Sequence, residues 1–115
     1  MLTAAKTAGV RIDLVNLMTM YFSTKKVVMA TACLGAAAAS QSFVVGLGAK
    51  LGVTPQIGKN PDKPYTVENF TLSDATILTA RLKALGYVTR LAFWELSADT
   101  AKYGGQYSKI MRAFT

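Results

Sequence analysis

An uncharged stretch from Val27 to Ala49 constrains the fold of this chain more than any other feature of its sequence. The stretch holds 23 residues between Lys26 and Lys50, and none of them is charged or a proline. A continuous helix of this length extends about 34 Å, and the hydrocarbon core of a bilayer is about 30 Å thick. We therefore expect one transmembrane helix, within a segment that covers residues 25–50 with its flanking lysines.

The residues that flank and interrupt the stretch bear on this expectation. The lysine side chains at its two ends are placed to reach lipid headgroups, for example those of an anionic phospholipid such as cardiolipin; they are Lys25, Lys26 and Lys50. Gln41 and its serine neighbours weaken the hydrophobic signal. The alternative is an alanine-rich helix buried in a soluble bundle.

Small residues recur within the stretch at intervals of four. Such spacing lets helix backbones approach closely, and it is a common way for membrane helices to associate. Gln41 would then form its hydrogen bonds on a partner helix, because facing lipid would leave its amide unsatisfied. We expect the helix to pack against other spans through two rows, Thr31, Gly35 and Ala39 in one and Ala32, Ala36 and Ser40 in the other.

The flanking regions complete an expected all-α fold. In residues 1–24, apolar side chains such as Leu14, Leu17 and Met18 follow a helical period, which predicts an amphipathic helix. Residues 51–72 contain the prolines and several glycines, and we expect an extended connector there. Residues 73–115 predict short amphipathic helices in a peripheral module, with Gly86 ending the first of them.

The charge balance is basic, with 13 Lys and Arg residues, 6 acidic residues and a net charge of +7. The cations are scattered along the chain, and the only adjacent pair is Lys25 and Lys26. No run of cations alternates with aromatic residues, as in many RNA-binding sheets. We therefore expect no nucleic-acid partner and keep a basic ribonucleoprotein component only as a third alternative.

The residue types needed for common catalytic sites are scarce. The chain has no histidine and a single cysteine, Cys33, which excludes Ser-His-Asp triads, Cys-His pairs and the usual zinc ligand sets. The acidic residues form no evident pair, and Asp62 and Glu68 lie in the expected connector, where solvated side chains are the default. We expect no enzyme activity, no cofactor, no metal and no small-molecule substrate.

No motif identifies a family. The expected layout is similar to that of the small single-span accessory subunits of respiratory complexes and ATP synthases, which is a likeness of architecture only. It implies a non-catalytic structural or assembly subunit of a multi-subunit energy-transducing complex, in the mitochondrial inner membrane, whose partners are the other subunits. The second interpretation is a soluble helical protein-interaction module.

Overall fold

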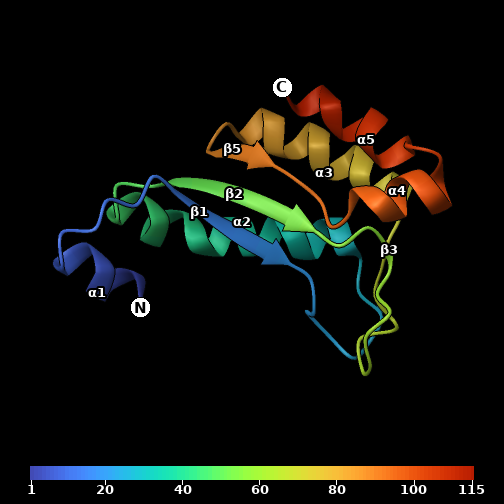
Figure 1. Ribbon diagram of the computed structural model, residues 1–115, viewed down its shortest axis with the longest axis horizontal. Coiled ribbons are helices and arrows are strands. Elements are labelled where there is room, and N and C mark those ends of the chain that lie inside the picture. Colours follow the sequence, from blue (N-terminus) through green and yellow to red (C-terminus); the bar gives the residue numbers. More distant parts are fainter.

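The computed structural model describes residues 1–115 as a mixed α/β fold (Figure 1). The chain forms five strands and six helical segments. In order they are α1 (Leu2–Thr7), β1 (Leu14–Thr19), α2 (Met29–Gly46), β2 (Lys50–Pro55), β3 (Gly58–Lys59), β4 (Asn69–Phe70), α3 (Leu72–Leu85), β5 (Val88–Leu91), α4 (Leu96–Tyr103), α5 (Gln106–Met111) and the 3₁₀ helix η1 (Arg112–Phe114).

A three-stranded parallel sheet organises the molecule, in the order β1-β2-β5. Helix α2 connects β1 to the adjacent β2, and α3 leads from the β3–β4 ribbon into β5. Figure 1 shows β1 and β2 side by side across α2, with α3 and α5 grouped beside them. The result is one sheet with its helices packed on one side.

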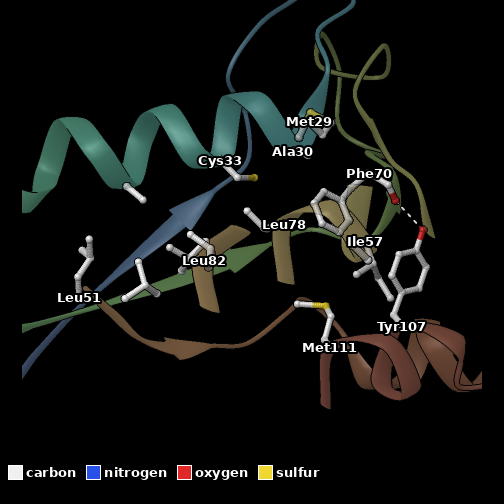
Figure 2. Close-up of a cluster of buried hydrophobic side chains, with 14 of the residues drawn as sticks. Met29, Ala30, Cys33, Leu51, Ile57, Phe70, Leu78, Leu82, Tyr107 and Met111 are labelled. Carbon is white, nitrogen blue, oxygen red and sulfur yellow. Dashed lines mark hydrogen bonds between the residues drawn. The ribbon is translucent and has the colours of Figure 1, made fainter. Parts of the chain in front are cut away.

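The core lies between the sheet and this helix layer (Figure 2). Because side chains alternate along a strand, Leu51 and Val53 of β2 point to the same face. Both are almost fully buried, together with Leu78 and Leu82 of α3. Tyr107 of α5 closes one end of this core, where its hydroxyl donates to the carbonyl oxygen of Phe70 at 2.6 Å.

The structure corrects the expected all-α fold with a transmembrane helix. The uncharged stretch does form a helix, α2, but this helix connects two neighbouring strands of one sheet. By length and composition alone, α2 is the one helix that suits a bilayer crossing. In this fold a crossing along α2 would bring the unpaired edge of β1 into hydrocarbon, where each unsatisfied backbone group costs several kcal/mol. The buried face of α2 instead covers the sheet, through Met29, Ala30, Cys33, Ala37 and Val44.

The amphipathic helix expected in residues 1–24 is also wrong. The region forms the short helix α1 and the strand β1. Apolar residues at positions 14, 17 and 18 fit a helical period, but Val15, Leu17 and Thr19 also fit the two-residue period of a strand. Pairing with β2 selects the strand, because it satisfies the backbone groups on one side of β1.

The extended connector expected in residues 51–72 is instead part of the folded sheets, and residues 73–115 are not wholly helical. The first region contributes β2, the central strand, and the short β3–β4 ribbon, while the second contains β5 between its helices. The expected end of the first helix is confirmed, since Gly86 ends α3 in a left-handed conformation, with φ 76°. At its other end, Thr71 and Asp74 form a capping box.

Candidate functional site

The face of the sheet opposite the helices is uncovered. Strand register and alternation place ten residues on it, at the positions that face away from the buried side of Leu51 and Val53. They form four rows across the strands: Leu14 with Lys50; Asn16 with Gly52 and Arg90; Met18 with Thr54 and Ala92; and Gln56 with Trp94. No acidic residue belongs to these rows.

Most of this uncovered face is open to solvent. Met18 is 75% exposed and Trp94 is 59% exposed, and the Lys50 and Arg90 side chains are also exposed. A parallel sheet normally has both faces covered, so a three-stranded parallel sheet with one bare face is unusual.

Gly52 lies at the centre of the uncovered face. A Cβ atom at this position would lie 2.5 Å from Oδ1 of Asn16 and 3.3 Å from Cβ of Arg90. The absence of a side chain therefore allows Asn16 and Arg90 to approach across the central strand. Asn16 is fixed there by the hydrogen bond that its Nδ2 donates to Oγ1 of Thr54, at 2.7 Å.

A small pocket opens where the uncovered face meets the carboxyl ends of the strands. It has a volume of about 160 Å³, and Trp94 and Gln56 line it together with Lys59, Lys102 and Glu95. The Oε1 atom of Gln56 is buried and has no hydrogen-bond partner. In open α/β sheets, ligands bind outside the carboxyl ends of the strands, which is where this pocket lies.

The outer edge of β1 is unpaired. The Lys50 N–H donates to the Asp13 carbonyl at 3.0 Å, so in a parallel ladder the odd-numbered residues of β1 bond to β2. The backbone groups of Leu14, Asn16 and Met18 therefore point outward, and none of them has a hydrogen bond within the chain. At the opposite edge of the sheet, η1 lies beside β5 and shares a pocket with it.

The buried carboxylates hold backbone segments in place. Glu68 is 2% exposed and accepts hydrogen bonds from three consecutive N–H groups, those of Tyr21, Phe22 and Ser23, and from Nδ2 of Asn60. These contacts fix the turn after β1, in which Tyr21 has a φ of 60°. The expectation that Glu68 is solvated is therefore wrong, because the turn needs its carboxylate as an acceptor.

Asp74 and Asp99 accept hydrogen bonds from backbone N–H groups at the N-termini of helices. Asp74 accepts from the Ala30 N–H of α2 at 3.0 Å, and its other oxygen accepts from Thr71. Asp99 accepts from the N–H groups of Tyr107 and Ser108 at the start of α5. Carboxylates suit helix N-termini because unpaired N–H groups and the helix dipole both favour negative charge there.

Cys33 is fully buried under the sheet, where its Sγ contacts the Thr19 carbonyl oxygen. Burial raises the pKa of its thiol to about 11. The thiolate is the reactive form of cysteine, so this side chain is unreactive at neutral pH. The chain contains no group of three potential metal ligands that converge.

The surface is electropositive because the chain has more lysine and arginine than acidic residues, and almost none of these cations forms an ion pair. The only ion pair joins Arg11 to Asp13, at 2.7 Å between Nε and Oδ1, and both side chains are largely exposed. Every other lysine and arginine side chain is without a carboxylate partner. Three of the six acids are buried and held by backbone N–H groups, so few carboxylates remain at the surface beside the 13 lysine and arginine residues.

The residues predicted to pack helices lie on two different strips of α2. Thr31, Gly35 and Ala39 face solvent, whereas the second row, Ala32, Ala36 and Ser40, is half-buried, as is Gln41. Thr31 and Gly35 line a groove of about 550 Å³ between α2 and α3. The structure therefore places the two rows in different surroundings, and none of these residues is fully buried.

The predicted headgroup lysines are not gathered into one site. Lys25 and Lys26 lie in the exposed turn before α2, while Lys50 lies beyond the far end of α2, on the uncovered face. Sequence reasoning missed that Lys50 shares a face with Arg90 and Trp94, because the two chain segments become neighbours only through strand pairing. The one available signal was the presence of a single tryptophan next to an apolar, β-prone run.

Comparisons with family models, with curated proteins and with solved structures find no match to this chain.

Proposed function

We propose that this protein is a non-catalytic structural subunit that assembles with a second copy of itself through strand β1. The observation that carries the proposal is the row of outward N–H and C=O groups along an uncharged edge strand. Natural proteins usually protect such an edge with charge, proline, a bulge or a covering element. None of these protects β1 between Leu14 and Thr19.

The pairing geometry restricts the possible arrangements. Only even-numbered residues of β1 have free backbone groups, so an antiparallel partner must pair even positions with even positions. A two-fold axis at any residue of the strand satisfies this condition; we place it at Leu17, near the middle of β1, which sets Asn16 opposite Met18 of the second copy. Residues that lie directly opposite each other point to the same face of a sheet, so the even-numbered side chains of both copies share one face. Both helix layers would therefore lie on the other side of one continuous six-stranded sheet.

The side chains of β1 are compatible with this two-fold axis. The strand contains no charge, so self-pairing opposes no like charges within it. Val15 would lie opposite Thr19 of the second copy, and the two Leu17 side chains would meet at the axis. The two uncovered faces would then join into one surface.

The earlier expectation of a respiratory complex or ATP synthase rested on a single-span layout that this fold does not have. A mitochondrial location and partners in such a complex stay untested expectations. A structural role without catalysis fits the placement of the buried carboxylates, which hold backbone N–H groups. It also fits the raised pKa of the buried Cys33 thiol, which keeps this side chain protonated at neutral pH.

The test replaces Met18, whose N–H points outward and whose side chain is exposed. Met18→Pro removes that donor without removing a bond to β2, whereas Met18→Ala shortens the side chain and keeps the donor. We expect light scattering to give twice the chain mass of 12.3 kDa for the wild type and for Met18→Ala. Met18→Pro is expected to give the monomer mass with an unchanged circular dichroism spectrum.

A monomeric wild type at all accessible concentrations would contradict the proposal. So would a dimer that persists in Met18→Pro, since that dimer would use another surface. A hetero-assembly that requires the β1 edge would also count against self-pairing, because a different chain would then occupy the edge.

A further inference from the structure

We propose that the uncovered face of the sheet binds single-stranded nucleic acid, with Trp94 as the platform on which a base stacks. The proposal goes beyond self-assembly and does not require it, because each chain carries the complete set of rows. It replaces the expectation of no nucleic-acid partner, which rested on the lack of a run of alternating cations and aromatic residues in the sequence, because strand pairing places residues from separate segments on one face. It rests on three features of the face: its charge, its exposed tryptophan and the unpartnered amide beside that tryptophan.

The charge of the face matches a phosphate backbone. Lys50 and Arg90 project from neighbouring strands, and neither forms an ion pair. No carboxylate belongs to the four rows between Leu14 and Trp94. Glu95 is the one acid at the adjoining pocket, where Lys59 and Lys102 outnumber it. A surface with this excess of cations attracts polyanions, and binding to it gains free energy from counterion release.

Trp94 distinguishes a nucleic acid from other polyanions. A tryptophan that is 59% exposed at the carboxyl end of a sheet offers a π-face with no partner in the chain, since its ring takes part in none of the aromatic pairs. Stacking of a base on an aromatic ring stabilises single-strand binding without sequence preference. Sulfated sugars and lipid headgroups lack a base that could use this ring.

The pocket beside Trp94 supplies hydrogen-bonding groups. Gln56 lines this pocket, and its Oε1 is buried without a partner, so a rotation of the side-chain amide toward the pocket would let that acceptor bind a ligand's N–H group. Lys59 and Lys102 line the same pocket and can contact phosphate. An unstacked nucleotide has a planar base, polar base edges and a phosphate. These match the ring of Trp94, the amide of Gln56 and the ammonium groups of Lys59 and Lys102.

A single strand fits better than a duplex. Duplex readers place a helix or a ribbon in a groove, and here the exposed element is the face of a sheet. Bases reach such a face only when they are unpaired and splayed out. We therefore expect oligo-U and oligo-dT to bind more tightly than a duplex of equal length.

The first measurement uses the protein's own fluorescence, because Trp94 is the only tryptophan in the chain. Titration with single-stranded oligo-dT should quench its emission, and binding should weaken as salt rises. Heparin, which has the charge but no bases, should bind without comparable quenching. Anionic lipid vesicles are the third probe, and tight vesicle binding with no response to oligo-dT would overturn the proposal.

Variants locate the site by the anisotropy of a labelled oligonucleotide. Trp94→Ala should weaken binding by about fivefold or more, and Trp94→Phe, which keeps an aromatic face, should restore most of the affinity. Arg90→Gln should weaken binding and reduce its salt dependence. Arg81→Gln removes the same charge from α3, away from the face, and should have a smaller effect.

Equal effects of Arg90→Gln and Arg81→Gln would show only diffuse attraction and would overturn the site. Unchanged affinity in Trp94→Ala would overturn the stacking role. Titration of the wild type at concentrations where light scattering gives the monomer mass separates this proposal from self-assembly and leaves Met18, a residue of the face, unchanged. If the monomer binds oligo-dT, the face functions alone; if the wild type is monomeric at all concentrations and binds, only the assembly proposal fails.

Discussion

At the scale of single residues, Asp99 shows how the acids of this chain are used. Its carboxylate is fully buried and accepts three hydrogen bonds from Tyr107 and Ser108. Burial acts to raise the pKa of Asp99, but these hydrogen bonds outweigh it and hold the pKa below its ordinary value. The folded state therefore prefers the charged form, which ties α4 to the start of α5.

The first prediction follows from this preference. Asp99→Asn keeps the shape but turns an amide group toward N–H donors, so we expect the free energy of unfolding in urea to fall by about 1–3 kcal/mol at neutral pH. Asp13→Asn is the control, because its exposed ion pair with Arg11 contributes about 1 kcal/mol or less. Equal losses for the two variants would contradict the role assigned to Asp99.

The same residue predicts an acid dependence. A carboxyl group with a lowered folded-state pKa contributes stability above its unfolded-state pKa of about 3.9, and this contribution is lost as pH falls through the folded value. Wild-type stability should therefore fall below about pH 4. The Asp99→Asn variant should lose less over that range, and parallel acid curves for the two proteins would contradict the assignment.

At the scale of elements, the sequence predicts helices well where a local signal marks their ends, and it predicts strands poorly here. The end of α3 at Gly86 follows from local chemistry, and so does the helical tail. Strand β2 was missed because Gly52 and Pro55 are typical of loops. Gly52 is instead required by the close approach of Asn16, a contact between positions far apart in sequence.

The candidate site was missed for the same reason. Its rows combine residues from β1, β2 and β5, so no window of the sequence contains them together. The long apolar stretch was also ambiguous, because a crossover helix packed on one face and a bilayer helix can share a composition. Only the pairing of β1 with β2, the strands before and after α2, shows that α2 is a crossover helix.

Substitutions at two glycines test whether local propensity governs α2 and long-range contact governs β2. A Cβ atom at Gly35, on the exposed side of α2, would meet nothing within 4 Å. Gly35→Ala should therefore raise the free energy of unfolding by about 0.5–1 kcal/mol, through the higher helix propensity of alanine. Gly52→Ala should lower it, because the new Cβ would collide with Asn16. Thermal unfolding of both variants measures the two signs, and a loss of stability in Gly35→Ala would indicate a hidden contact on that face.

At the scale of the whole molecule, the unpaired cations make stability depend on salt. The molecule measures 43 × 32 × 23 Å, so at about 0.01 M salt, where the Debye length is about 30 Å, its positive charges repel across most of its width. At about 0.1 M the Debye length falls to about 10 Å and this repulsion is largely screened. A net charge of +7 with one ion pair means that screening removes more repulsion than attraction.

We therefore expect the melting temperature to rise by about 3 °C between these two salt concentrations at neutral pH, which corresponds to roughly 1 kcal/mol or less. The Met18→Pro variant is the suitable protein, because self-association through β1 would itself respond to salt. Near pH 9.8, where the net charge approaches zero, the same change in salt should leave the melting temperature almost unchanged. A melting temperature that falls with salt at neutral pH would mean that attractive charge pairs outweigh the repulsion, which the single exposed pair of Arg11 and Asp13 cannot supply.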